Sequence, residues 1–220
     1  MTISSHSPSA NSSGTDFIAM LSLARRGDPT ARGELFSRYI NYLNILATTQ
    51  LDAKLRRRVS PSDLVQETML SAHRDFKDFR GDTQGELLGW LRKILIHSLH
   101  RAIARHVKAD KRDVRREIPL EVISTGVEES AVTLANVLEA TGQSPSQVVQ
   151  AKEVAVGLSD QLAKLKPDYR DVIVYRILQG LSFEEVAARM NRSSAATRML
   201  FLRAIDQFKT TFEQKPTSDG

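Results

Sequence analysis

The chain has 220 residues, 41% of them hydrophobic, which is enough for one large or two small domains with real cores. It contains no cysteine, which excludes disulfides and thiolate metal sites and favours a reducing cytoplasm. No apolar run approaches the roughly 20 residues that span a bilayer, and the N-terminus lacks the pattern of a signal peptide. We therefore expect a cytoplasmic protein without membrane insertion.

The formal net charge of +5 is unevenly distributed along the chain. From Arg101 to Arg116 there are seven basic and two acidic residues, so this stretch alone accounts for +5. From Glu117 to Gln150 there are five glutamates and no Lys or Arg, a net charge of −5. This polarity predicts a basic face beside an acidic linker.

The N-terminal part predicts a tail followed by two helices. Residues 1–15 are rich in Ser, Asn, Pro and Gly and predict a disordered tail. An apolar pattern then predicts a first helix that Gly27 ends. Asp28 is placed to cap a second, longer helix, with Pro29 in its first turn and an apolar face that continues to Leu46.

Two further helices are predicted from their start signals. Ser60, followed by proline, predicts the start of a helix that ends near Phe76. Thr83 and Glu86 form a capping-box pattern that opens the longest helix. One face of this helix is apolar, and the other is expected to present the basic side chains of Arg92, Lys93, His97, Arg101, Arg105 and Lys108.

The middle of the chain predicts a linker between two domains. Residues 117–144 lack sustained periodicity and contain Pro and Gly, with room only for a short helix at Val132–Leu138. No stretch shows the alternation of half-buried strands, so the fold class is all-α. We expect two small helical domains, 16–112 and 146–212, an acidic flexible linker at 113–145 and a second tail at 213–220.

The C-terminal domain carries a helix-turn-helix pattern. A helix from Ser144 is expected to end at Pro167, and a second to end at Gly180. Ser182 and Glu185 then form a capping box for a short helix. Asn191 suits the left-handed conformation of a tight turn, and Ser193 can cap the helix that follows. We expect a four-helix, winged-helix-like domain, although an αα-hairpin that only packs would share this pattern.

In helix-turn-helix geometry the second helix enters the major groove of DNA. Ser193, Ser194, Arg198 and Met199 would then lie near base edges, and Arg192 and Arg203 near phosphates. Met199 could touch a thymine methyl group or pack inside the domain.

Several segments together resemble bacterial RNA polymerase sigma factors of the extracytoplasmic-function (ECF) type. The segment Asp63–Arg74 resembles the polymerase-binding helix of that family. Phe79–Thr83 and Gly89–Leu95 resemble its promoter-melting segment, and Leu165–Phe208 resembles its C-terminal DNA-binding domain. The resemblance implies that the chain binds core RNA polymerase through the β′ clamp and β flap, recognises promoter DNA and initiates transcription. It also implies a possible anti-sigma partner.

The resemblance also implies roles for individual residues. Asp63, Gln66 and Glu67 would face the β′ clamp, although acidic pairs at this spacing also occur on simply solvated helices. The loop 76–83 would hold a base flipped from the minus-ten element, with Phe79 and Arg80 favoured over Phe76 and Trp90. The cationic groove beside it would consist of Arg92, Lys93 and Arg101.

The sequence has two rival interpretations, an enzyme and a stand-alone regulator. His97, His100 and His106 do not complete a metal-ligand set, and neither phosphate loops nor nucleophile motifs occur, so we expect no metal, no cofactor and no enzyme activity. The stronger alternative is a helix-turn-helix regulator that acts without core polymerase; such a protein has no need of the acidic helix and the aromatic loop. The acidic linker could in addition shield the basic surfaces of the free protein.

Overall fold

A computed structural model describes residues 11–51, 53–56, 58–109, 119–136 and 148–213. These residues form helices and contain no strand, which confirms the predicted all-α class. The helices are α1 (Asn11–Arg25), α2 (Pro29–Ser37), α3 (Ile40–Gln50), α4 (Ala53–Arg56), α5 (Pro61–Asp75), η1 (Phe76–Asp78), α6 (Gln84–Ala109), α7 (Leu120–Asn136), α8 (Val148–Lys164), α9 (Pro167–Ile173), the π-helical turn η3 (Val174–Leu178), α10 (Phe183–Met190) and α11 (Ser194–Glu213).

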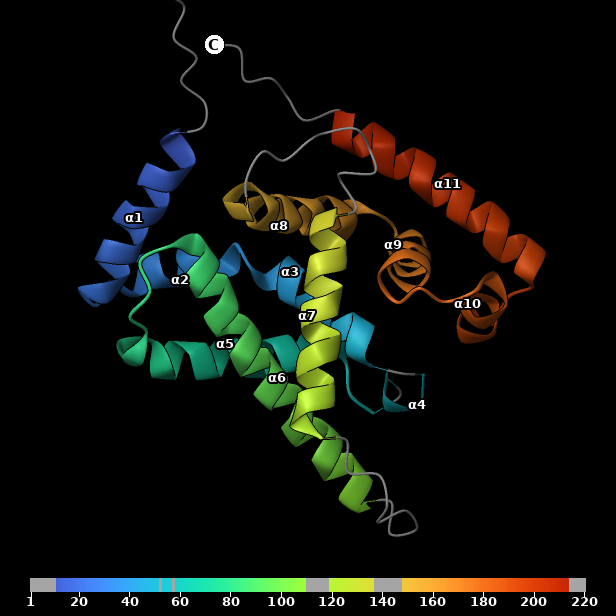
Figure 1. The fold of residues 1–220 in the computed structure, drawn as a ribbon, viewed down its shortest axis with the longest axis horizontal. Helices are drawn as coiled ribbons and strands as arrows, with labels where there is room; N and C mark the ends of the chain where they lie inside the picture. Colours follow the sequence, from blue (N-terminus) through green and yellow to red (C-terminus); the bar gives the residue numbers. More distant parts are fainter. Residues whose placement is uncertain (1–10, 52, 57, 110–118, 137–147, 214–220) are drawn as a thin grey trace, which may run out of the picture.

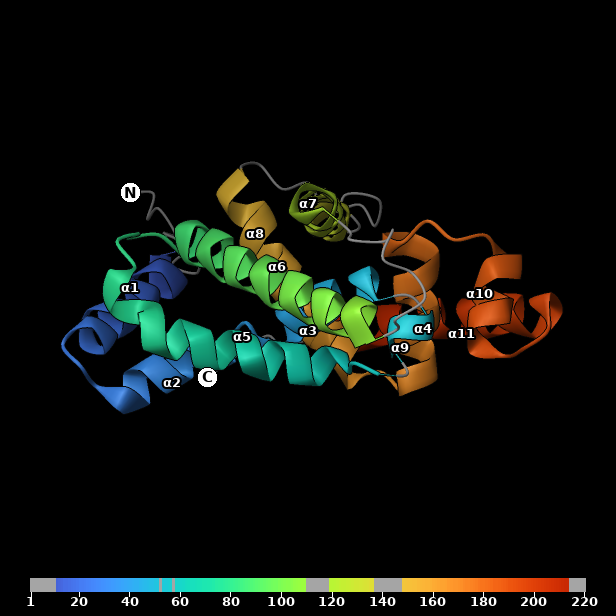
Figure 2. The same cartoon turned by 90° about the horizontal axis from the view of Figure 1, so that it is seen from below.

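The helices form an elongated body with α1 and α2 at one end and α10 and α11 at the other (Figures 1 and 2). Helices α5 and α6 lie against each other along the N-terminal part, and α3 packs against α5, α7 and α8. The buried apolar side chains form one continuous core that extends from Phe17 to Phe208. The two predicted domains are therefore in contact in this arrangement.

Most predicted helix starts are confirmed. The Asp28 carboxylate accepts hydrogen bonds from the backbone N–H groups of Thr30 and Ala31, and the Ser60 hydroxyl accepts one from the N–H of Asp63. Thr83 and Glu86 exchange the two capping-box bonds at the start of α6. These signals are local in sequence, and the helices begin where they predict.

The N-terminal boundaries differ from the prediction in two places. Helix α1 begins at Asn11, inside the predicted disordered tail, whereas residues 1–10 and 214–220 lie outside the described residues. The single helix predicted from Pro29 to Leu46 is two helices, because the chain turns between Ser37 and Ile40. At the turn, the Ser37 hydroxyl donates to the Glu34 carbonyl and competes with the helical ladder.

The segment predicted as a flexible linker with room for one short helix contains a longer, packed helix, α7. Helix α7 buries Ile123, Val127, Ala131 and Leu134, which are spaced three or four residues apart and lie on one face. This face contacts α3, α6 and α8, and Figure 1 shows α7 in the middle of the molecule. Only part of the predicted short helix Val132–Leu138 coincides with α7. The remaining linker residues, 113–118 and 137–145, lie outside the described part of the chain.

Candidate nucleic-acid interface

The helix-turn-helix consists of α10 and α11 joined by a tight turn. The Ser182 hydroxyl accepts from the N–H of Glu185, and the Ser182 N–H donates to the Glu185 carboxylate. These hydrogen bonds from Ser182 lower the pKa of Glu185. Asn191 is left-handed, with φ 54° and ψ 49°, and the Ser193 hydroxyl caps α11 by accepting from the N–H of Ala196. The sequence predictions for the capping box, the turn and the second cap are confirmed.

Packing between α10 and α11 fixes which face of α11 is outward. Val186 and Ala187 of α10 are buried, as are Thr197 and Ala204 of α11. The two helices therefore pack against each other through these side chains. Further C-terminal helices complete the unit, since α11 also packs against α9 and α8.

The outward face of α11 carries most of the residues that the sequence predicts for the minus-thirty-five element. Ser193, Arg198, Met199 and Arg203 are exposed, Ser194 is half-buried, and Arg192 lies exposed in the preceding turn. Met199 is 51% exposed, so it does not pack inside the domain. The sequence alone did not decide between a packed Met199 and one that faces DNA. These residues share one accessible surface.

Two of the cations on this surface already have acidic partners. The Arg198 guanidinium lies 3.3 Å from the Glu184 carboxylate and 5.5 Å from the centre of the Phe183 ring. The Arg192 guanidinium is 2.5 Å from the Asp168 carboxylate. The four charged side chains are at least 40% exposed, so each ion pair orients its cation and can be exchanged for a phosphate contact at little energetic cost. Sequence spacing alone did not reveal either pair.

The predicted polymerase-binding residues lie on α5, on a surface that meets the basic side of α6. Asp63 and Gln66 are exposed. Glu67 is half-buried; its carboxylate accepts a hydrogen bond from Arg105 at 3.1 Å and forms an ion pair with Arg101 at 3.2 Å. The predicted polymerase contact and a predicted DNA contact, Arg101, are therefore paired with each other. An exposed leucine, Leu70, follows them one turn later on α5.

The predicted base-holding loop is tightly packed. The Phe79 ring is only 5% exposed; it stacks on Phe76, with a centroid distance of 6.1 Å, and lies 5.2 Å from the ring of Trp90. Gly81 is held close to it, since an added Cβ would come within 2.7 Å of the Phe79 ring. Arg80 is exposed and donates to the Lys77 carbonyl. The sequence favoured Phe79 over Trp90, but here Trp90 is the more accessible ring.

Arg25 of α1 holds this loop in place, a role that the sequence did not reveal. Its guanidinium donates to the Asp82 carboxylate at 2.8 Å and to the Gly81 carbonyl at 2.6 Å, and it lies 5.9 Å from the centre of the Phe79 ring. Arg25 thus ties α1 to the loop. Because the two segments are more than 50 residues apart, no local pattern could have signalled the contact.

The expectation that Arg92 lies on the open basic face is wrong. Its side chain is only 13% exposed, and it donates to Glu128 of α7 at 2.9 Å and to the Tyr42 hydroxyl at 3.1 Å. Burial opposes its charged form, yet the interactions with Tyr42 and Glu128 raise the pKa of Arg92. Burial also raises the pKa of Tyr42. Lys93, the next residue, is exposed as predicted.

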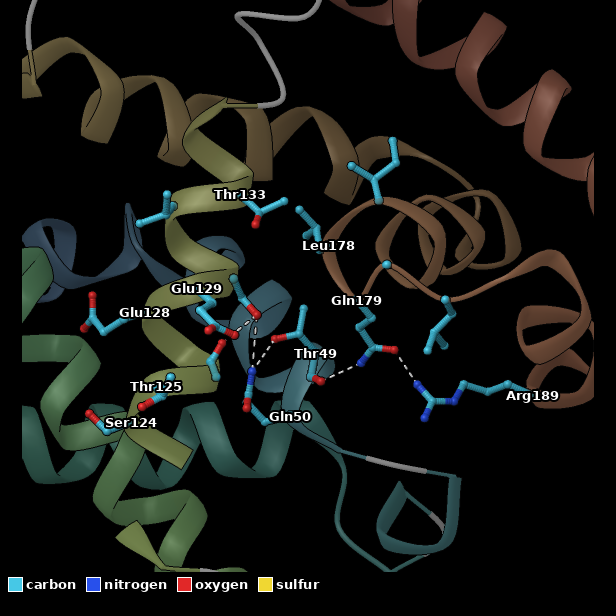
Figure 3. Close-up of a pocket in the computed structure, with 16 residues that line it drawn as sticks. Thr49, Gln50, Ser124, Thr125, Glu128, Glu129, Thr133, Leu178, Gln179 and Arg189 are labelled. Atoms are coloured by element: carbon cyan, nitrogen blue, oxygen red, sulfur yellow. Dashed lines mark hydrogen bonds between the residues drawn. The ribbon is translucent and has the colours of Figure 1, made fainter. Parts of the chain in front are cut away.

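A groove of about 1070 Å³ lies between α7, the C-terminal end of α3 and η3 (Figure 3). Hydroxyl and amide side chains line much of it, together with Glu129 and Arg189. Across it, the Gln179 amide donates to the Thr49 carbonyl, and Arg189 donates to the other end of the Gln179 amide. These contacts join the C-terminal helices to α3.

The described residues hold no cluster of His, Cys, Asp and Glu that could bind a metal ion. Within the same residues, no helix combines the length and the apolar character that crossing a membrane requires.

Comparison with known proteins relates the chain to one family. The family model for ECF sigma factors matches residues 14–205. The ECF RNA polymerase sigma factor BldN of Streptomyces coelicolor is 28% identical over 199 residues, which cover 90% of this chain and 66% of BldN. The ECF RNA polymerase sigma-E factor of Haemophilus influenzae is 24% identical over 196 residues, 89% of this chain and 94% of the relative. The solved structure of CnrH in complex with the cytosolic domain of CnrY covers 91% of this chain and 99% of that chain, at 20% identity and a TM-score of 0.33.

Proposed function

This chain belongs to the ECF sigma factor family and so acts in transcription initiation with RNA polymerase, and we propose that it does so by recognising two promoter elements with two separate surfaces. The surface of α11 binds the minus-thirty-five element. The loop after α5 and the basic side of α6 bind and melt the minus-ten element. The chain contributes binding only, and no catalysis, and it acts in the cytoplasm.

The observation that carries this proposal is the acidic, hydrogen-bonding surface of α5, which lies on a different element from the helix-turn-helix. Asp63 and Gln66 are exposed there, and Glu67 is accessible beside them. A regulator that acts on duplex DNA alone has no use for such a surface. We assign it to the β′ clamp of core polymerase, because acidic groups on one helical face complement a basic partner.

Of the cations that the resemblance assigns to the minus-ten element, Arg80, Lys93 and Arg101 are exposed. Arg80 and Lys93 can contact phosphates of an opened strand directly, and Arg101 can do so by exchanging its partly exposed ion pair with Glu67. Phe79 and Arg92 can take part only if the loop and α7 move, since both side chains are covered. We therefore propose that the minus-ten contact residues inferred from the sequence form two groups. One group can contact DNA in the structure described here, and the other can do so only after the loop and α7 have moved.

At the minus-thirty-five element, we propose base contacts from Ser193, Ser194, Arg198 and Met199, and phosphate contacts from Arg192 and Arg203. The outward face of α11 supports this, because it is accessible and cationic. We also propose that residues 16–112 and 146–212 separate as two domains on the polymerase, where the second one meets the β flap. An anti-sigma protein would instead bind the form described here, in which the two domains are in contact.

The test is transcription by core RNA polymerase with the purified chain. Mapping of transcript starts after expression of the chain supplies the promoters, and specific initiation at them is expected only when the chain is added. Replacing both Asp63 and Glu67 by their amides should weaken binding to core polymerase at least tenfold, while Arg198→Ala should reduce initiation without changing that binding. Glu129→Gln, an exposed acidic control on α7, should alter neither. Tight binding to a duplex site with no initiation would instead identify a stand-alone regulator.

A further inference from the structure

The recognition surface of α11 contains a pair of exposed apolar side chains. Met199 is 51% exposed and Leu202 is 60% exposed, and both lie on the same side of the helix because they are three residues apart. Their neighbours Leu200 and Phe201 pack against the core instead. Met199 and Leu202 therefore serve no packing role in this arrangement, and Leu202 was not among the residues that the sequence singled out.

Cations border this apolar pair. Arg198 precedes Met199, Arg203 follows Leu202, and both arginines are exposed. Arg198 is held to one side by the Glu184 carboxylate and the Phe183 ring, which leaves the apolar pair uncovered. A strip with arginines at its edges and apolar groups at its centre matches a surface with phosphates at its edges and apolar groups at its centre.

The major groove of DNA has this character where it contains thymine. The C5 methyl group of thymine is the apolar group among the base edges in that groove, whereas the other positions present hydrogen-bond donors and acceptors. The phosphates that flank the groove attract arginine. Met199 is the sixth residue of α11 and Leu202 the ninth, so both lie in the first three turns, the part of a recognition helix that reaches base edges.

We propose that Met199 and Leu202 form a methyl-reading pair that selects thymine in the upstream promoter element. This inference rests on the proposed function and specifies its chemistry: the preferred site contains one or two thymines under α11, recognised by shape and apolar contact rather than by hydrogen bonds. Arg192 and Arg203 supply affinity that does not depend on sequence.

Deoxyuridine tests the proposal directly, because it pairs like thymidine and lacks only the methyl group. The holoenzyme of chain and core polymerase is titrated, at fixed salt, against duplex probes in which each thymine of the upstream element is replaced in turn. Wild-type affinity should fall about three- to fivefold at one or two positions, the effect of withdrawing one buried methyl group. Met199→Ala and Leu202→Ala should bind the thymine probe more weakly and should no longer distinguish it from the uracil probe there.

Two control variants separate methyl reading from general effects. Arg203→Ala should weaken binding to every probe while the thymine-to-uracil ratio is unchanged, as expected for a phosphate contact. Gln207→Ala, an exposed change further along α11, should leave both quantities unchanged. Thermal unfolding of each variant verifies that the fold is retained.

The outcomes are distinguishable. The inference is overturned if no uracil substitution affects the wild type, or if Met199→Ala and Leu202→Ala both keep the full preference for thymine. It is also overturned if these variants weaken binding to core polymerase in the absence of DNA, which would assign the surface to a protein partner. Failure of the holoenzyme to initiate on the unmodified promoter would instead refute the proposed function.

Discussion

Replacing Glu128 by glutamine should destabilise the protein, because Glu128 is the acidic partner of a nearly buried arginine. The two side chains join α7 to α6, with a nitrogen–oxygen distance of 2.9 Å between the Arg92 guanidinium and the Glu128 carboxylate. Arg92 also donates to the Tyr42 hydroxyl on α3. The substitution therefore tests whether α7 is a docked helix rather than the flexible linker that the sequence predicts.

The exposure of the two partners sets the expected magnitude. Exposed ion pairs contribute about 0–1 kcal/mol, whereas removing one partner of a fully buried pair costs roughly 3–5 kcal/mol. Arg92 is 13% exposed but Glu128 is 48% exposed, so solvent screens this pair in part. Glutamine also keeps an oxygen that can accept the hydrogen bond. We expect Glu128→Gln to lower the free energy of unfolding by about 1–2 kcal/mol.

Equilibrium urea unfolding of a double-mutant cycle provides the measurement. Glu128→Gln and Arg92→Met are made singly and together, and the coupling free energy should be about 1 kcal/mol and should fall as salt increases. Glu129→Gln removes the neighbouring, exposed carboxylate of α7 and should change stability by less than about 0.5 kcal/mol. A coupling indistinguishable from zero, with Glu128→Gln as mild as the control, would refute the docking of α7 on α6.

Further stability predictions concern the C-terminal helices and the N-terminal core. Gly157 is exposed within α8 and has no heavy atom within 4 Å of an added Cβ, so Gly157→Ala should stabilise by roughly 0.5–1 kcal/mol. Gly180 has φ +64°, so the matched Gly180→Ala should instead destabilise by about 1 kcal/mol; thermal unfolding distinguishes the two signs. Ser182→Ala removes the α10 cap and should cost about 1 kcal/mol in urea unfolding. Burial and, to a lesser extent, the charge of Arg32 lower the pKa of His73. As the pH falls, His73 is therefore protonated in the unfolded chain at a higher pH than in the folded protein. Stability should fall as the pH drops below about 6.5, the ordinary histidine pKa, and His73→Gln should reduce that fall; an identical pH profile for both proteins would contradict this.

Local sequence signals were sufficient for much of the fold and for the helix-turn-helix. The caps at Asp28, Ser60 and Ser182 bond to backbone groups two or three residues away, so their effect does not depend on the rest of the chain. Asn191 adopts the left-handed conformation for the same local reason. The turn between α10 and α11, and with it the outward face of α11, could therefore be predicted from the sequence.

Other features depended on partners that are distant in the sequence. Helix α7 lies in a segment with turn-forming residues, yet Ile123, Val127 and Leu134 form a face that is buried only because α3, α6 and α8 surround it. Arg92 lies on the side of α6 that the sequence marks as basic, but Glu128 and Tyr42 cover it. No pattern within one helix can reveal such a neighbour.

Hydrogen bonds within a few residues specify the capped helix starts and the turn of the DNA-binding motif, so these features follow from the sequence alone. Which of the predicted contact residues are available depends instead on how the helices pack. Met199 and Arg203 lie open on α11, whereas Phe79 is buried among other rings and Glu67 is paired with Arg101. Accessibility and charge pairing depend on which surfaces meet when the helices pack, and residues far apart in the chain set both.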